Sequence, residues 1–194
     1  LFRRFDMMAA GVREVASRVD ALFFVAPELI ESMGTVSLAS ERLSQRWQME
    51  VRVRLCPRRI VPTAQSVFGA YGAPALSIMA QTPYDETAGV QQRHALEDAL
   101  LAQPDALLVH RLRSMPPLLN TRQPMPPIAF DLDDLEHVSY ARSLEQPPHW
   151  RGQRLLKLRL PALRRGQGRA VRLSTRTLVC SEADRQALSR DAGT

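Results

Sequence analysis

The strongest constraint on this chain is a series of five short apolar runs rich in Val, Leu and Ile. They cover residues 21–26, 51–56, 106–110, 128–132 and 177–180. Most are nearly continuous rather than alternating, which is typical of strands in a parallel sheet covered on both faces. The second run alternates, with Arg52 and Arg54 between apolar residues, so we expect that strand at an edge of the sheet.

Longer stretches with helical spacing separate these runs. Apolar residues recur every three or four positions across residues 5–19, 36–47 and 86–102, and a polar helix start is found at 181–188. Strands that alternate with helices predict an α/β fold: a doubly wound, mostly parallel sheet with helices on both faces. Residues 57–83 show no single period and are predicted as loop with one short helix. The prolines between residues 116 and 127 are predicted to form a rigid connector.

The segment 151–176 is ambiguous between strand and helix. Its Leu-Lys-Leu-Arg-Leu stretch alternates as a strand does, but the length of the segment favours a helix. Pro161 is expected to kink such a helix, and Gly166 with Gly168 is expected to break it.

Length and composition place the chain among ordinary globular proteins. It has 194 residues, of which 45% are hydrophobic and 24% are charged, so disordered, collagen-like and disulfide-scaffold classes are excluded. We treat residues 1–194 as one domain. No apolar run approaches the roughly 18 to 20 residues that span a bilayer. Cys56 and Cys180 are predicted to be buried free thiols.

The net charge of +6 is concentrated in one segment. Residues 1–150 have a net charge of −2 and residues 177–194 of −1, whereas residues 151–176 hold nine basic groups and no acid. Leucines lie between these bases, which predicts contact with an anionic membrane or an anionic ligand. The alternative is a solvated helix face whose apolar side lies in the core. Nucleic acid is disfavoured because no aromatic residue is interleaved with these basic residues, so nucleobases could not stack there. The candidate contact residues are Arg151, Arg154, Lys157, Arg159, Arg164 and Arg165.

Polar residues follow three of the predicted strands where each strand ends. They are His110 and Arg111, then Asp131, Asp133, Asp134 and Glu136, and finally Ser181 and Glu182. Carboxyl ends of parallel strands share one edge, and ligands of open α/β sheets bind there. Four carboxylates within six residues raise each other's pKa and need a metal, a cationic ligand or arginines nearby. In the alternative interpretation, Asp133 or Asp134 caps the next helix, Ser181 caps the last one, and His110 is structural.

The sequence Asp131-Leu132-Asp133-Asp134 resembles the first motif of haloacid-dehalogenase-type phosphatases, in which two aspartates hold Mg²⁺ and one attacks phosphorus. The match is partial. Leu135 stands where that family favours Thr or Val, and no acidic pair follows downstream.

A second resemblance covers nearly the whole chain. Residues 104–110 (Pro-Asp-Ala-Leu-Leu-Val-His), 130–136 (Phe-Asp-Leu-Asp-Asp-Leu-Glu) and 177–184 (Thr-Leu-Val-Cys-Ser-Glu-Ala-Asp) carry it in order. Together they resemble the N-terminal, acceptor-side domain of a group-1, family 4-like retaining glycosyltransferase of the B-type fold. Such enzymes move a sugar from a nucleotide-sugar to a glycan or lipid-linked acceptor without a bound metal or cofactor. The resemblance implies catalytic roles for His110 and Asp131. It implies acceptor-binding roles for Arg111, Asp133, Asp134, Glu136, Ser181 and Glu182.

The same resemblance sets expectations about the rest of the enzyme. The donor-binding C-terminal domain is expected outside this chain, and the first strand with its Gly-rich turn is expected before Leu1. On that basis the isolated chain is expected to be inactive. The family implies a cytoplasmic protein at the inner face of the plasma membrane that serves polysaccharide or envelope synthesis. Two alternatives stay open: a non-catalytic α/β binding domain, and a Mg²⁺-dependent phosphatase.

Overall fold

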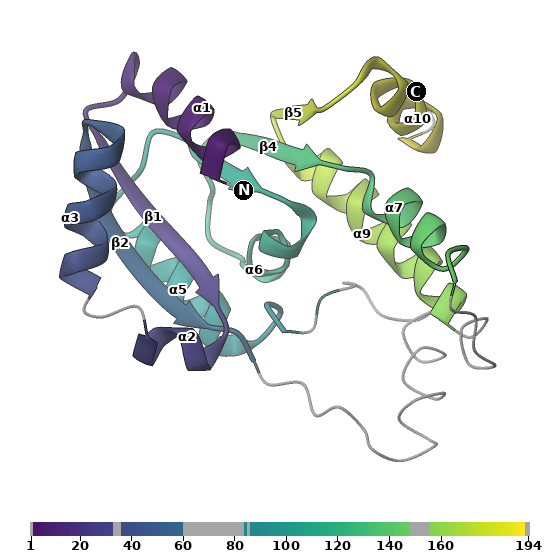
Figure 1. Ribbon diagram of the computed structural model, residues 1–194, viewed down its shortest axis with the longest axis horizontal. Coiled ribbons are helices and arrows are strands. Elements are labelled where there is room, and N and C mark those ends of the chain that lie inside the picture. The colour runs from purple at the N-terminus through teal and green to yellow at the C-terminus, as the bar shows by residue number, and fades with distance from the viewer. Residues whose placement is uncertain (1, 33–35, 60–83, 85, 148–155, 193–194) are drawn as a thin grey trace.

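The computed structural model describes residues 2–32, 36–59, 84, 86–147 and 156–192 (Figure 1). Its parallel sheets are flanked by helices, which confirms the predicted α/β class. In chain order the elements are α1 (Phe2–Arg13), β1 (Arg18–Val25), α2 (Pro27–Ser32), α3 (Val36–Trp47), β2 (Glu50–Pro57), α5 (Val90–Leu100), β3 (Leu107–His110), the 3₁₀ turn η1 (Leu112–Ser114), α6 (Pro116–Asn120), β4 (Ile128–Asp133), α7 (Glu136–Ser143), the 3₁₀ turn η2 (Lys157–Arg159), α9 (Leu160–Leu173), β5 (Arg176–Val179) and α10 (Glu182–Ala192).

The strands form two parallel ladders rather than the one sheet that the sequence predicts. One ladder pairs β1 with β2, and the other has the order β3–β4–β5. Among the residues described, no ladder hydrogen bonds join the two. Strand β2 has the alternation expected of it, with Val51 and Val53 buried and Arg52 and Arg54 exposed.

Helix α3 covers the outer edge of β2. The hydroxyl of Ser44 accepts a hydrogen bond from the backbone N–H of Val51 at 2.9 Å, and that of Ser40 accepts one from Val53 at 3.0 Å. Because the two serines are four residues apart, they lie on the same face of the helix. Backbone donors at the edge of this sheet are thereby paired, which protects the edge from pairing with another chain.

The main core lies under the three-stranded ladder. Its buried apolar side chains are Leu96, Val109, Leu112, Met115, Leu118, Ile128, Phe130, Leu132, Leu135 and Ala170. Leu96 comes from α5, which also packs against β1 and β2. Leu22 of β1 contacts the same core. Helix α5 therefore ties the two ladders together.

Several predicted boundaries are wrong for identifiable reasons. The helix expected over residues 5–19 ends at Arg13, because residues from Arg18 onward pair with β2. Pairing in a ladder here overrides the local helical period. Helix α5 begins at Val90 rather than at residue 86. The predicted proline connector contains a helix, since Pro116 and Pro117 form the first turn of α6 and are buried. Most of the loop expected over residues 57–83 lies outside the described residues.

The ambiguous basic segment is a helix over Leu160–Leu173. Pro161 lies in the first turn of α9, where its missing N–H has no partner within the helix, so it does not kink the helix. Gly166 and Gly168 lie inside the helix without breaking it. The buried face consists of Ala162, Leu163, Gly166, Gln167 and Ala170. These mostly small side chains allow a close approach to the rest of the fold.

Candidate functional site

The carboxyl ends of β3, β4 and β5 meet at one edge, as the sequence predicts. All three strands are parallel, and His110 pairs directly with Asp131 across β3 and β4. Leu178 of β5 pairs with Asp131 on its other side. Residues paired in this way project from the same face of a sheet, so these three side chains form one row.

His110 and Asp131 form a closely packed pair. Nδ1 of His110 lies 2.7 Å from Oδ2 of Asp131, and the side chains are 16% and 3% exposed, respectively. A carboxylate partner favours the tautomer with its proton on Nδ1, which leaves Nε2 as the proton-accepting nitrogen. Because Asp131 is buried, it holds the ring of His110 in a fixed orientation.

Arg111 and Asp133 form a second pair beside the first. Nε and Nη2 of Arg111 donate to Oδ2 of Asp133 at 3.1 and 2.7 Å. Both residues have a φ of 66°, in the left-handed region that side chains other than glycine seldom adopt. The register between β4 and β5 shifts between Asp131 and Asp133. Bulges and backbone strain of this kind re-aim side chains and are concentrated at binding and catalytic sites.

Cys180 joins this second pair. Its Sγ lies 3.6 Å from Oδ1 of Asp133. The residue is exposed, so the prediction of a buried thiol is wrong for Cys180, although it holds for Cys56. The difference arises because β5 ends at Val179, which leaves Cys180 on the outer edge of the sheet.

Glu136 begins helix α7 at the same edge. Burial raises the pKa of its carboxyl from 4.5 to about 7, and the backbone N–H of Leu112 partly offsets this by donating a hydrogen bond to it. A carboxyl with a pKa near neutral pH can both give and take a proton. Glu136 is therefore a third proton-handling group near the His110–Asp131 pair.

The remaining predicted acceptor-binding residues make other contacts. Asp134 is exposed, and its N–H donates to the carbonyl of Leu132. Ser181 accepts a hydrogen bond from the N–H of Asp184 and donates one to its carboxylate, so it caps α10. Glu182 accepts two hydrogen bonds from Arg185 in the first turn of that helix. Ser181 and Glu182 thus stabilise the start of α10.

Three of the six predicted basic contact residues lie exposed on η2 and α9. Lys157, Arg164 and Arg165 are exposed. Arg159 is half-buried, with its guanidinium 5.8 Å from the ring centre of Tyr140. Arg151 and Arg154 lie outside the described residues.

Sequence reasoning missed two apolar side chains on the face that carries His110 and Asp131. Leu108 of β3 is 44% exposed and Leu178 of β5 is 50% exposed. Leu108 lies two residues before His110, so both project from the same face of β3. Period-two spacing back from His110 would have identified Leu108, but only the strand register identifies Leu178.

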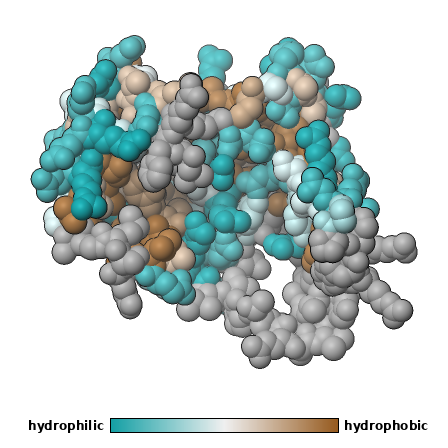
Figure 2. Space-filling view, viewed as in Figure 1, coloured by the Kyte–Doolittle hydropathy of each residue, from teal (hydrophilic) through white to brown (hydrophobic). Residues whose placement is uncertain are grey.

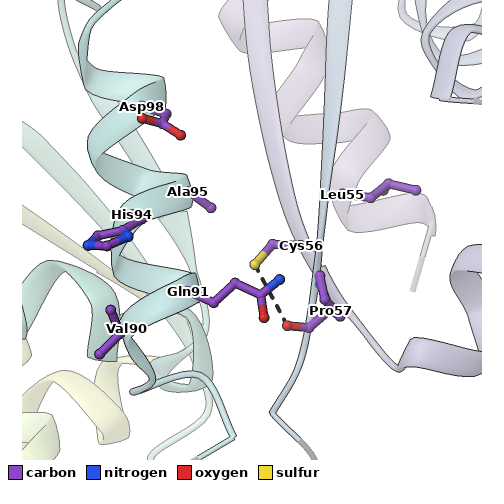
Figure 3. Close-up of a pocket in the computed structure, with 8 residues that line it drawn as sticks. All are labelled: Leu55, Cys56, Pro57, Val90, Gln91, His94, Ala95 and Asp98. Carbon is purple, nitrogen blue, oxygen red and sulfur yellow. Dashed lines mark hydrogen bonds between the residues drawn. The ribbon is translucent and has the colours of Figure 1, made fainter.

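A separate hollow of about 440 Å³ lies between the end of β2 and helix α5 (Figure 3). Leu55, Cys56, Pro57, Val90, Gln91, His94, Ala95 and Asp98 line it. Figure 3 shows Gln91 reaching toward Cys56 and Pro57. Burial raises the pKa of the Cys56 thiol, which disfavours the reactive thiolate. Cys56 is therefore a poor nucleophile in this hollow.

No helix in the described part of the chain is both long enough and apolar enough to cross a membrane. Comparison with family models, with curated proteins and with solved structures found no match to this chain.

Proposed function

We propose that this chain is the acceptor-side domain of a retaining glycosyltransferase, which moves a sugar from a nucleotide-sugar to a glycan or lipid-linked acceptor. The observation that carries the proposal is the buried His110–Asp131 pair at the carboxyl edge of parallel strands. Ligands of open parallel sheets bind at this edge. The sequence resemblance to such enzymes includes both residues.

The His110–Asp131 pair supplies what an acceptor hydroxyl needs. Nε2 of His110 accepts a hydrogen bond from the hydroxyl and takes its proton as the oxygen attacks the sugar. Asp131 fixes the ring and stabilises the resulting imidazolium. The hydroxyl oxygen forms the new bond to the anomeric carbon on the same face from which the nucleotide leaves with the electron pair of the bond that breaks, so the configuration is retained.

The Arg111–Asp133 pair adds a guanidinium, which donates hydrogen bonds, and a carboxylate, which accepts them, so both can bind further hydroxyl groups at this edge. Asp134 and Glu136 add carboxyl oxygens along it. Sugars present many hydroxyl groups, each of which is both a donor and an acceptor, so alternating carboxylate and guanidinium groups suit them.

The phosphatase alternative gains less from this geometry. Asp131 is hydrogen-bonded to His110, and Asp133 is hydrogen-bonded to Arg111. A Mg²⁺ site of the phosphatase kind needs both carboxylates to bind one ion. In the segments that the structure covers, no three His, Cys, Asp or Glu side chains are grouped as metal ligands.

On the glycosyltransferase proposal, the nucleotide-sugar donor is bound by a further domain, and the reaction takes place at the cytoplasmic face of the membrane.

Expression of the full reading frame that contains this chain tests the proposal. Incubated with radiolabelled nucleotide-sugars and a membrane extract as the source of acceptor, the full product should transfer label, and the isolated chain should not. His110→Ala and Asp131→Asn in the full product should lower the transfer rate by roughly 10² to 10⁴-fold, the range for a lost general base.

His94→Ala is the matched control, because His94 is an exposed histidine on α5 that lines the separate hollow beside β2. It should leave transfer unchanged. If the full product transfers no sugar from any nucleotide-sugar, or if His110→Ala retains full activity, the proposal fails.

A further inference from the structure

Every charged residue on the outward face of α9 is basic. Arg164, Arg165 and Arg172 are exposed on α9, and Lys157 is exposed on η2 just before it. They recur at intervals of seven or eight residues, about two helical turns or roughly 11 Å apart. We call these four residues the basic stripe. Between Glu145 and Glu182 the sequence holds no acidic residue.

The stripe lies opposite the buried face of the helix. Leu163 and the small residues of α9 are buried, and Leu158 and Leu160 are partly buried. Leu158, Leu160 and Leu163 therefore pack inward. The outward face of α9 is charged and carries no large apolar side chain that could insert into a membrane, so any contact made by the stripe is electrostatic.

Helix α7 packs along α9 and adds no net positive charge beside the stripe, because its exposed Arg142 is followed by the exposed Glu145. Figure 2 shows hydrophilic surface in the region where α7 and α9 lie in Figure 1. The stripe begins at Lys157, near the end of α9 that lies toward the carboxyl ends of the strands, because α9 leads back to the start of β5.

We infer that the basic stripe docks this chain on an anionic lipid membrane. The charges lie in a row along the helix, at Lys157, at Arg164 with Arg165, and at Arg172, and such a row fits a planar anionic surface. Each Lys or Arg near such a surface raises the binding constant about fivefold. A polynucleotide is the poorer match, because residues 156–180 contain no aromatic side chain on which bases could stack. The inference does not depend on sugar transfer and can be tested on the chain alone.

Co-sedimentation with vesicles tests this docking. The chain should bind vesicles of phosphatidylcholine with about 30% phosphatidylglycerol and should not bind phosphatidylcholine alone. Binding should be lost as salt rises from about 0.1 M to about 1 M, since the screening length falls from about 10 Å to about 3 Å. The triple variant Lys157→Gln, Arg164→Gln and Arg172→Gln should bind roughly 100-fold more weakly.

A second triple variant controls for net charge. Arg42→Gln, Arg54→Gln and Arg190→Gln removes the same charge from exposed arginines on α3, β2 and α10. It should bind anionic vesicles nearly as well as the parent chain, and circular dichroism should show both variants folded. Docking through the stripe is ruled out if neutral and anionic vesicles recover the chain equally, if neither recovers it, or if the two triple variants weaken binding alike. Tighter binding to polyadenylate than to the anionic vesicles at the same salt would replace the membrane with a nucleic acid.

Discussion

At the scale of single residues, two carboxyl groups at one edge of the fold have been given different surroundings. Asp131 is buried against the ring nitrogen of His110. Glu136 is half-buried and accepts a hydrogen bond from the N–H of Leu112, and the effect of burial is the larger one, so its pKa rises to about 7. Two carboxyl groups five residues apart thus differ in what packs against them, and burial raises the pKa of Glu136.

The raised pKa of Glu136 predicts a specific pH dependence of stability. The folded chain holds this proton to a higher pH than the unfolded chain does. The free energy of unfolding therefore falls as the pH rises from about 4.5 to about 7, and then levels off. Glu136→Gln cannot ionise and removes this fall, which is on the order of 3 kcal/mol. Urea titrations of wild type and variant at about pH 4 and about pH 8 measure the difference.

Glu145→Gln is the control, because Glu145 is exposed. Its free energy of unfolding should follow that of the wild type at both pH values. If the stability of Glu136→Gln falls as steeply with rising pH as that of the wild type, the raised pKa of Glu136 is not the cause of the fall.

At the scale of elements, α3 owes its position to polar contacts as much as to apolar packing. No residue of α3 is fully buried. Its serines pair with backbone groups at the edge of β2, and Arg46 forms an ion pair with Asp6 of α1 at 2.7 Å. A surface ion pair adds little to stability, so the serine contacts to β2 are the ones that anchor the helix.

The contact between α3 and β2 can be weakened one hydroxyl at a time. Ser44→Ala leaves the N–H of Val51 without its acceptor and should lower the free energy of unfolding by about 1 to 2 kcal/mol. Hydrogen exchange should show faster exchange at the Val51 amide in particular. Ser139→Ala makes the same change on the exposed side of α7 and should have almost no effect. Unchanged exchange at Val51 would refute the edge contact.

At the scale of the whole molecule, the two ladders behave as one fold only if a shared element holds them. Helix α5 is that element, because it contacts β1, β2 and α6 and places Leu96 in the core under β3 and β4. The crossover from β2 through α5 to β3 thus determines how the β1–β2 ladder and the β3–β4–β5 ladder pack together.

Leu96→Ala tests this coupling. The substitution removes a side chain that is only 6% exposed and should lower the free energy of unfolding by about 2 to 4 kcal/mol. Hydrogen exchange should speed up at Val53 in one ladder and at Phe130 in the other. Leu101→Ala, at a residue that is 79% exposed, should change neither. Faster exchange in only one ladder would show that the two unfold independently.

Local patterns in the sequence were sufficient for the strands and the principal helices. The apolar runs identified the five strands in the described part of the chain, because strands of a parallel sheet are rich in Val, Leu and Ile. The rule that parallel strands share a carboxyl edge was sufficient to bring His110 and Asp131 together. Both results depend on local composition and on a general property of parallel sheets.

Only the tertiary structure decided the rest, because it depends on which segments pair. The end of α1, the division into two ladders and the position of Leu178 follow from strand register, which no local period reveals. The left-handed backbone at Arg111 and Asp133 likewise depends on the surrounding strands. Sequence alone placed leucines among the arginines of residues 151–176. Folding turned Leu158, Leu160 and Leu163 inward and left Lys157, Arg164, Arg165 and Arg172 exposed, because burying apolar surface stabilises the fold and burying unpaired charge does not.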